Sequence, residues 1–347
     1  MRYLIIGDGN SPHLLKWAKT LKKDVDLYLF SFNRLSDELK SILGEKKAFS
    51  ANLSVSQTGG NYSILKYASL LNSIIKYVHP DIVNPHYITS NGFMAVLVKK
   101  LMKYDYKIVS SCWGSDILVN PNRNFLYKKI TRYILKHSDL ITSDSYSMTD
   151  KILDFCNKRV LTFPFGVENI PNVTNKEPLL FFSNRMLKPN YNIDKIVSFF
   201  KNIHDRDKRS RLIIANDGVL RDDILGQISS LGLSSAVEYV GFLSKEKQDE
   251  IYAKSTFYIS IPDSDATSVS LLEAMSFGCI PIVSNIPSNR EWVWDGYNGF
   301  YFDGNIDRLF SVQSRIDEFL KINQEIIRKR GLWQNNISNF LKVIYEL

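Results

Sequence analysis

Short runs of aliphatic, β-branched and aromatic residues alternate along the chain with longer segments in which apolar residues recur every three or four positions. The short runs have the length and composition of buried strands, and the longer segments have the period of amphipathic helices. Alternation of this kind is typical of parallel sheets that are covered by helices on both faces. We therefore predict an α/β protein with two doubly wound, Rossmann-like domains that face each other across a cleft.

The expected elements form two sets. The strand candidates of the first half are Tyr3–Ile6, Asp26–Ser31, Ile82–Pro85, Lys107–Cys112, Leu140–Thr142 and Val160–Phe163. Those of the second half are Leu179–Ser183, Arg211–Ala215, Val237–Val240, Phe257–Ile261, Ile280–Ser284 and Gly299–Phe302. Helices are predicted, for example, at Pro12–Leu21, Ser63–Tyr77, Asn91–Met102, Asn124–His137 and Lys245–Ala253. Residues 49–60 and 118–124 are expected to be loops.

A chain of 347 residues is long for one hydrophobic core, so two domains are the natural expectation. Residues 168–177 are polar, contain a proline and three asparagines, and show no hydrophobic period, which is typical of a linker. The predicted organisation is an N-terminal domain at 1–167, a linker at 168–177 and a C-terminal domain at 178–329. A final helix at 330–347 is expected to pack back on the N-terminal domain.

The composition is that of an ordinary globular protein, with 44% hydrophobic and 23% charged residues. Uninterrupted apolar runs stay below the roughly 18 residues that a membrane span needs, and the first residues lack the apolar core of a signal peptide. The three cysteines are far apart and have no metal-ligand spacing, which fits a reducing compartment. We therefore expect a cytoplasmic protein without disulfides or structural zinc.

Positive charge is concentrated in the first half of the chain. Residues 1–167 carry 23 Lys and Arg against 13 Asp and Glu, whereas the remainder carries 21 against 23. Such a half can face anionic lipid headgroups, a phosphate-bearing acceptor or nucleic acid, or it can simply be a solvated basic surface. Nucleic acid is disfavoured, because the lysines are scattered over many predicted helices and no RNA- or DNA-binding signature is present.

The segment 264–281 carries the clearest chemistry: a polar turn follows a strand and leads into an apolar helix that is expected to begin near Ser268. Free backbone N–H groups at such a helix start, together with the helix dipole, would hold a diphosphate. Asp265 and Glu273 lie on either side of this start, and Glu273 could bind the vicinal hydroxyls of a ribose. The alternatives are structural, since Ser270 and Glu273 also have capping-box spacing and Asp265 suits an ordinary turn.

Residues 264–303 resemble the donor-site segment of the retaining GT-B glycosyltransferases of family 4, the glycosyl transferases group 1. The shared order is two acidic residues separated by seven others, then Ala-Met, and then Gly278, Pro281, Ser284-Asn285, Asn289-Arg290-Glu291 and Asp295-Gly296-Tyr297-Asn298-Gly299. The resemblance implies that Glu273 binds the ribose and that Asp265 touches the donor sugar. The phosphates would be bound at Thr267, Ser268 and Val269, through the amides of the last two.

Further matches extend the resemblance in the second half. Arg185 follows a strand where the family places an arginine that clamps the diphosphate, and fixed cations of this kind stabilise a leaving diphosphate without a metal. The family's next cation, a lysine, falls here at Asn190 or Tyr191, so it is missing and Lys188 is the nearby substitute. The positions whose backbone would line the nucleotide base are Asn216, Gly218, Gly241 and Phe242.

The resemblance is weaker in the first half. Trp113 stands where many members have a histidine, so that role does not transfer, and its ring could instead stack on a sugar. Asp116 matches the family and is expected to bind hydroxyls or to orient its loop. The turn after the first strand, with Gly9 and Asn10, would face a sugar, although a tight turn without a ligand fits better. His86, at another strand end, is a further cleft-lining candidate.

The resemblance implies transfer of a sugar from a nucleotide sugar with retention of configuration, with a UDP-linked donor preferred over GDP- or dTDP-linked ones. Arg185, Asp265, Glu273 and Asp116 would be the catalytic residues. The leaving phosphate assists the incoming hydroxyl, so neither a protein nucleophile nor a metal or other cofactor is required. The basic first half adds the hypothesis of an acceptor on a polyprenyl-diphosphate lipid at the inner membrane surface, as in polysaccharide or O-antigen assembly.

Other functions are weighed against this one. A UDP-sugar 2-epimerase shares the two-domain architecture and needs no acceptor, but the pattern from Asp265 to Glu291 disfavours it. An inactive GT-B subunit that supports a partner transferase is compatible with the missing lysine and histidine. A NAD-linked dehydrogenase is excluded as far as motifs allow, because Pro12 stands where the dinucleotide fingerprint needs its third glycine.

Overall fold

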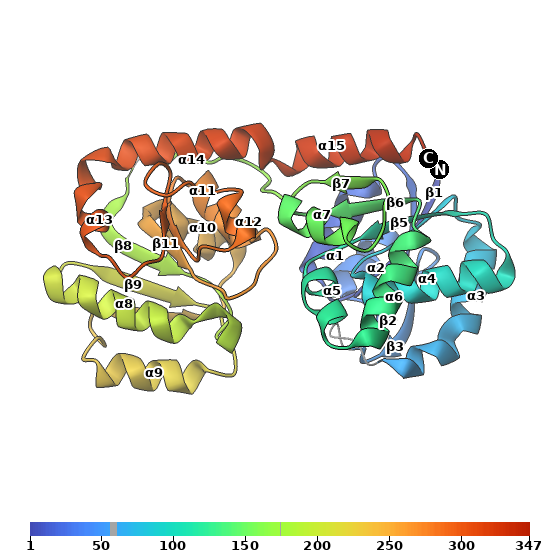
Figure 1. Cartoon of the computed structure of the whole chain (residues 1–347), viewed down its shortest axis with the longest axis horizontal. Helices are drawn as coiled ribbons and strands as arrows, with labels where there is room; N and C mark the ends of the chain where they lie inside the picture. The colour runs from blue at the N-terminus through green and yellow to red at the C-terminus, as the bar shows by residue number, and fades with distance from the viewer. Residues whose placement is uncertain (56–60, 174) are drawn as a thin grey trace. The chain divides into compact units, whose positions relative to one another are not determined.

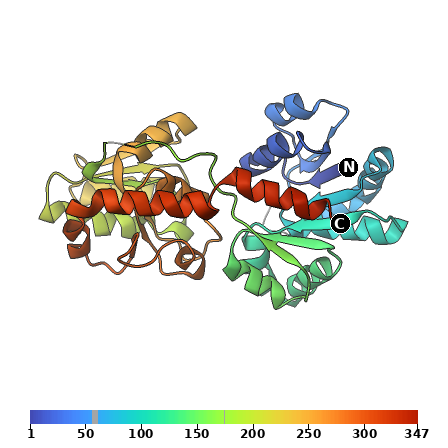
Figure 2. The same cartoon turned by 90° about the horizontal axis from the view of Figure 1, so that it is seen from above.

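The structure is a computed structural model that describes residues 1–55, 61–173 and 175–347. It divides into an N-terminal unit, Met1–Phe163 with Val343–Leu347, and a C-terminal unit, Pro164–Lys342. In each unit helices lie on both sides of a parallel sheet (Figures 1 and 2). The predicted α/β class with two Rossmann-like domains is confirmed.

The N-terminal unit contains a seven-stranded sheet of order β3-β2-β1-β4-β5-β6-β7. Its strands are β1 (Arg2–Ile6), β2 (Asp26–Asn33), β3 (Ala48–Leu53), β4 (Ile82–Pro85), β5 (Lys107–Ser111), β6 (Leu140–Ser143) and β7 (Val160–Thr162). Its helices are α1 (Pro12–Leu21), α2 (Asp37–Leu43), η1 (Tyr62–Tyr67), α3 (Ala68–Val78), α4 (Ile88–Met102), α5 (Ser115–Leu118), η2 (Asn120–Asn122), α6 (Phe125–Lys136) and α7 (Tyr146–Leu153). The strand order reverses between β1 and β4, which is where such sheets bind ligands.

The C-terminal unit contains a six-stranded sheet of order β10-β9-β8-β11-β12-β13, with its reversal between β8 and β11. The strands are β8 (Glu177–Ser183), β9 (Arg211–Ala215), β10 (Val237–Gly241), β11 (Ser255–Ser260), β12 (Ile280–Val283) and β13 (Phe300–Tyr301). The helices are η3 (Pro189–Tyr191), α8 (Ile193–Arg206), α9 (Arg221–Ser230), α10 (Lys245–Lys254), α11 (Val269–Ser276), α12 (Pro287–Arg290), α13 (Asp307–Ser311), η4 (Gln313–Arg315), α14 (Ile316–Arg330) and α15 (Trp333–Ile344). The last residues of α15 are grouped with the N-terminal unit.

The central strands are continuous apolar runs because both of their faces are covered. In β1, Tyr3 pairs with Leu27 on one side and with Ile82 on the other, and the run Tyr3–Ile6 is wholly buried. In the C-terminal unit β11, the counterpart of β4, lies between β8 and β12, and all of its residues are buried. The two hydrophobic cores therefore fix the carboxyl ends of these strands, from which the polar loops emerge.

The twelve predicted strands are all present, with bounds within two residues of those expected. The predicted helix Ser63–Tyr77 is divided into η1 and α3, and α4 begins three residues before Asn91. The prediction of a loop at 49–60 is wrong for its first part, which belongs to β3, and residues 56–60 lie outside the described part. As an edge strand, β3 is only partly buried, so its sequence lacks an apolar run. Among the described residues, no helix is long and apolar enough to span a membrane.

Candidate functional site

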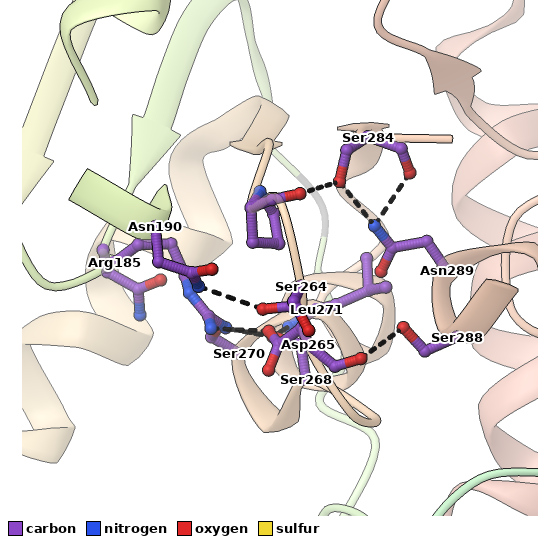
Figure 3. Close-up of polar contacts among 12 residues, drawn as sticks. Arg185, Asn190, Ser264, Asp265, Ser268, Ser270, Leu271, Ser284, Ser288 and Asn289 are labelled. Carbon is purple, nitrogen blue, oxygen red and sulfur yellow. Dashed lines mark hydrogen bonds and ion pairs between the residues drawn. The ribbon is translucent and has the colours of Figure 1, made fainter. Parts of the chain in front are cut away.

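Two loops meet at the carboxyl edge of the C-terminal sheet, where β8 and β11 lie side by side. Asn190, in the loop after β8, donates its Nδ2 to the carbonyl of Ser264 at 2.9 Å (Figure 3). Its own carbonyl accepts from the amide of Asp263 at 2.9 Å. Asn192 Nδ2 donates to the carbonyl of Ile261, also at 2.9 Å. These contacts join the two loops into one platform beside the start of α11.

Arg185 is the centre of this platform. Its Nη2 lies 2.6 Å from Asp265 Oδ2, and its Nη1 donates to Ser270 Oγ at 3.0 Å and to Ser268 Oγ (Figure 3). The Arg185 side chain is only 11% exposed. The three predicted residues Arg185, Asp265 and Ser268 are thus brought together from loops that are 80 residues apart in the chain.

Burial and ion pairing act against each other in this pair. Burial disfavours the charge of Arg185, but Asp265 outweighs it and keeps the pKa of the guanidinium above its ordinary value. Burial likewise raises the pKa of Asp265, and Arg185 opposes that rise. A separation of 2.6 Å is that of a charge-assisted hydrogen bond, so we assign both groups as charged. The arrangement fixes one cation at a helix start without leaving it solvated.

The position of the absent second cation is occupied by an aromatic ring. Of the two residues at which that lysine falls, Asn190 joins the loops, and Tyr191 lies under Arg185 with its ring centroid 4.4 Å from the guanidinium carbon. Lys188 is exposed at the start of η3. Tyr191 therefore supports the arginine by a cation–π contact instead of contributing a charge.

The start of α11 resolves one alternative of the sequence analysis. Ser268 is the N-cap, because its Oγ accepts a hydrogen bond from the amide of Leu271 at 3.3 Å. Ser270 lies inside the helix, and its hydroxyl contacts Arg185 and the hydroxyl of Tyr258, the latter at 2.8 Å. The capping box of Ser270 with Glu273 is therefore wrong. Thr267 and Ser268 are buried and Val269 is partly buried, so the predicted phosphate-binding segment is a largely buried helix start.

Glu273 lies further along α11 and is held by side chains of α10. Its carboxylate accepts from Gln248 Nε2 at 3.1 Å and from the hydroxyl of Tyr252 at 3.5 Å, and it lies 3.4 Å from Lys245 Nζ. Sequence reasoning missed Lys245 and Gln248. The only available signal was the amphipathic helix that carries them, and that pattern does not say which residue its polar side faces.

The predicted base-binding residues lie at the ends of β9 and β10. Asn216 has a positive φ of 84°, and its amide donates to the carbonyl of Gly241 at 2.6 Å. A Cβ on Gly218 would lie 2.3 Å from the carbonyl oxygen of Leu187, so this glycine is required by packing against the loop that carries Arg185. Phe242 is 79% exposed. These residues place exposed backbone and one exposed ring beside the platform.

In the N-terminal unit, His86 is buried with a defined tautomer. Its Nε2 lies 2.7 Å from Asn84 Oδ1, which also accepts from the Tyr3 hydroxyl at 2.9 Å. Asn84 Nδ2 donates to the carbonyl of Val109 and to Ser111 Oγ, so the amide orientation is fixed. An amide oxygen only accepts, so Nε2 carries the proton and Nδ1 keeps its lone pair. Burial lowers the pKa of His86 to about 3, which leaves the ring neutral.

A small pocket adjoins this histidine at the carboxyl edge of the sheet. Its lining includes Asp8, Asn33, His86 and Trp113, and the ring centroids of His86 and Trp113 are 5.0 Å apart. His86 Nδ1 has no hydrogen-bond partner within the described residues. The structure therefore brings Trp113 and His86 together, as expected of two residues that line one site.

Asp116 does not line this pocket. It is fully buried, and its carboxylate accepts from the amides of Ile88 at 3.0 Å, Trp113 at 3.1 Å and Gly114 at 3.0 Å. Burial raises the pKa of Asp116 to about 6 in spite of these bonds. Of the two roles considered for Asp116, orienting the loop of Trp113 fits this geometry, and contact with a substrate hydroxyl does not.

The glycine-rich turn after β1 has a structural explanation. A Cβ on Gly9 would lie 2.6 Å from the carbonyl oxygen of Arg34 and 2.7 Å from the side chain of Leu35. The Gly9 amide donates to Ser31 Oγ at 2.9 Å. Asn10 is exposed, and its amide donates to Asp8 Oδ1 at 3.1 Å. Gly9 is thus needed for packing against the loop that follows β2, and the tight turn without a ligand accounts for it.

Comparison with known families covers most of the chain. Residues 2–145 match the family described as Glycosyl transferase 4-like, and residues 167–332 match Glycosyl transferases group 1. With its two Rossmann-like units, the chain belongs to the GT-B glycosyltransferases of group 1. It is a glycosyltransferase, as the resemblance in its donor-site segment predicts.

Relatives of known activity are distant in sequence. The chain is 23% identical over 303 residues to N-acetyl-alpha-D-glucosaminyl L-malate synthase of Bacillus anthracis, covering 79% of this chain and 76% of that protein. It is 20% identical over 302 residues to alpha-monoglucosyldiacylglycerol synthase of Streptococcus pneumoniae, covering 79% of this chain and 67% of that protein.

Two solved structures have the same fold over the full length of both chains. Anabaena HepE in complex with UDP superimposes with a TM-score of 0.78 at 14% identity, and covers 100% of each chain. The lipopolysaccharide outer core galactosyltransferase WaaB superimposes with a TM-score of 0.71 at 19% identity, again over 100% of each. At these identities the likeness establishes the GT-B fold.

Proposed function

We propose that this glycosyltransferase moves a sugar from a nucleotide sugar, UDP-linked in preference to GDP- or dTDP-linked, to a hydroxyl group of a lipid-linked glycan with retention of configuration. The observation that carries the proposal is Arg185, fixed by Asp265 and Ser268 at the start of α11. A cation held at a helix start is suited to a leaving diphosphate, because the cation and the backbone N–H groups of the helix start both stabilise negative charge without rearranging.

Glu273 fits the ribose of such a donor. It lies four residues after the first residue of α11, a rise of about 6 Å along the helix. Its carboxylate is held by Gln248 and Lys245 and can accept hydrogen bonds from two vicinal hydroxyls. The solved complexes of HepE with UDP and of HepE with UDP-glucose support a uridine donor for this chain.

Retention follows the family's usual description, in which an oxygen of the leaving phosphate takes the proton of the incoming hydroxyl. The fixed Arg185 and the helix start supply the charge stabilisation that a metal ion provides elsewhere, so we propose metal-independent transfer. His86 would accept a hydrogen bond from a sugar hydroxyl through Nδ1, and Trp113 would offer its face to a sugar ring.

The lipid-linked acceptor is proposed from charge and from a relative. The excess of positive charge lies in the first half of the chain, and one relative is named for a glucosylated diacylglycerol. We propose a role in surface polysaccharide or O-antigen assembly at the inner face of the cell membrane. Equal transfer to soluble and to lipid-linked acceptors, with no preference for anionic vesicles, would refute this part.

The test begins with thermal-shift binding of UDP, GDP, ADP and dTDP to the wild type, Arg185→Ala and Glu273→Ala. Stabilisation by UDP alone, lost in both variants, is expected. Transfer is then followed by NMR of the anomeric proton with and without EDTA, and the product should keep the donor's configuration in both. Release of a changed nucleotide sugar without an acceptor would indicate an epimerase, and binding of none of the four would indicate an inactive partner subunit.

A further inference from the structure

Helix α6 of the N-terminal unit presents a continuous cationic face to solvent. Its twelve residues include Lys128, Lys129, Arg132 and Lys136, all exposed, and no Asp or Glu. At about 100° per residue these four lie within roughly 60° of Phe125 around the helix axis. The opposite side carries the buried residues Thr131, Ile134 and Leu135. The cations therefore form one stripe that runs the length of the helix.

Large apolar side chains are exposed at the beginning of the same helix. Phe125 is 70% exposed, Leu126 50% and, in the preceding turn, Val119 42%. The first turn is ordered, because Asn124 Oδ1 accepts hydrogen bonds from the amides of Leu126 and Tyr127 at 3.0 Å each. Lys129 Nζ lies 4.5 Å from the centroid of the Phe125 ring. Adjacent exposed apolar groups on a capped helix start indicate a surface that meets a partner.

This apolar tip lies at the same edge of the sheet as the pocket of His86 and Trp113. The chain leaves the carboxyl end of β5 and reaches α6 through α5 and η2. The turn η2 is fixed to the start of α4 by a 3.0 Å hydrogen bond from Asn120 Nδ2 to Thr89 Oγ1. Because β5 and β6 are parallel, α6 then runs back toward the opposite edge. The tip is thus beside the proposed acceptor pocket, and the stripe extends away from it.

The charge around this helix is strongly one-sided. Residues 61–138, which include α3, α4 and α6, contain eleven Lys and Arg against three Asp and Glu. Helix α4 packs against both α3 and α6, so these three helices form one layer (Figure 1). One of the three acids, Asp116, is buried and bound by backbone amides. The layer complements an anionic surface.

We propose that the start of α6 and its cationic stripe are the surface by which the chain docks on an anionic lipid bilayer. Phe125, Leu126 and Val119 enter the boundary between headgroups and acyl chains, and the cations pair with lipid phosphates. The aliphatic side chains decide against nucleic acid, because a phosphate backbone offers them no apolar environment. The proposal rests on the proposed function for its orientation, in which the acceptor pocket faces the lipid.

The test is cosedimentation of the full chain with two kinds of vesicle. One is pure phosphatidylcholine, and the other is phosphatidylcholine with about 30% phosphatidylglycerol, which makes the surface anionic. Binding to the anionic vesicles is expected, with weak binding to the neutral ones. Lys128→Gln, Lys129→Gln and Arg132→Gln combined should reduce the partition coefficient by about a hundredfold, since each cation contributes roughly fivefold. Phe125→Ser with Leu126→Ser should reduce it by about tenfold or more.

Matched controls lie elsewhere on the chain. Leu101→Ser removes a side chain that is 62% exposed and belongs to the same layer of helices. Leu101 is also close to cations, Lys100 and Lys103, but it lies at the end of α4, on the opposite edge of the sheet. It should leave binding unchanged, as should Arg328→Gln with Lys329→Gln on α14. Each variant must keep the wild-type midpoint of thermal unfolding and UDP binding.

Three outcomes would overturn the proposal. Wild-type vesicle binding by the Phe125/Leu126 variant would show that the tip does not enter the bilayer, and a larger loss in Leu101→Ser would place the docking surface at the other edge. Displacement from vesicles by duplex DNA, with the same charge dependence, would assign the stripe to nucleic acid. Vesicle binding as expected without transfer to a lipid-linked acceptor would instead refute the proposed function and leave the surface in place.

Discussion

The carboxyl edges of the two sheets differ in the kind of group that they fix. In the C-terminal unit Arg185, Asp265 and two serine hydroxyls form a charged cluster at a helix start. In the N-terminal unit the corresponding edge places the neutral ring of His86 beside Trp113, with Asp8 also lining the pocket and the Asp116 carboxylate bound to backbone amides. Two sheets of the same architecture therefore present different environments, because loops and not strands carry the chemistry.

This difference fits two different ligands. A nucleoside diphosphate needs fixed positive charge, whereas a glycan hydroxyl needs a neutral acceptor and an apolar surface against which a ring can pack. The predictions below separate the two edges, because each one disturbs a single edge.

The largest effect is expected from Arg185→Met. Removing the fixed cation should lower kcat/KM by about a thousandfold. It also leaves Asp265 buried and unpaired, at a cost of about 3–5 kcal/mol in the free energy of unfolding. Adding Asp265→Asn should restore stability but not activity, which is checked by chemical denaturation and by transfer assays. Arg315→Met, at an exposed pair with Glu318, is the control. A kcat/KM of the single variant within about tenfold of the wild-type value would show that Arg185 does not stabilise the leaving diphosphate.

Glu273→Gln is expected to weaken UDP binding by roughly ten- to a hundredfold, because hydrogen bonds to a charged acceptor contribute about 1.5–3 kcal/mol. Calorimetry with UDP and its 2′,3′-dideoxy analogue provides the test. The wild type should prefer UDP, and the variant should bind both alike. Glu246→Gln, exposed on α10, should behave as wild type. If the Glu273 variant still preferred UDP over the dideoxy analogue, the ribose hydroxyls would have to bind to a residue other than Glu273.

The pH dependence of the N-terminal edge should come from Asp116 and not from His86. With a pKa of about 6, Asp116 loses its charge as the pH falls, and the three amides that it accepts from are then left with a weaker acceptor. Acceptor kcat/KM should therefore fall about tenfold between pH 7.5 and pH 5, following one proton. His86, with a pKa of about 3, stays neutral over this range.

The measurement is a pH profile of acceptor kcat/KM beside one of UDP binding. The decline should affect the first and not the second, and Asp116→Asn should be slower but independent of pH. A decline that His86→Gln removes would contradict the assignment of the titration.

The smallest effect is expected from Tyr191→Lys, which restores the absent cation. It loses a cation–π contact of about 0.5–1 kcal/mol but adds attraction to the diphosphate. UDP affinity should rise about threefold at low ionic strength and return toward the wild-type value at about 0.5 M salt, roughly three times the physiological level. Tyr191→Phe keeps the ring and should change little. A tenfold fall in Lys188→Gln would show that Lys188 already serves as the second cation.

The pattern of apolar positions was sufficient for the strands and the division into two sheets. It failed at β3, where an edge strand is only partly buried and so lacks an apolar run. The motif order from Asp265 to Gly299 was sufficient for the family, whereas the ion pair of Arg185 with Asp265 was not predicted from the sequence. It could not distinguish Ser268 from Ser270 as the N-cap, because both are serines in the same turn.

The sequence alone determined the fold class and the family, and it singled out Arg185, Asp265 and Ser268, which the structure brings together, because burial periodicity and motif spacing are local properties of the chain. The tertiary structure decided what each polar side chain contacts. The tautomer of His86 depends on the orientation of the Asn84 amide, which Val109 and Ser111 fix from another strand, and Glu273 is held by residues of another helix. Asp116 became a loop-orienting group only once its carboxylate was placed against the amide of Ile88. Such contacts join segments far apart in sequence, and only the packing of helices on the sheets fixes them.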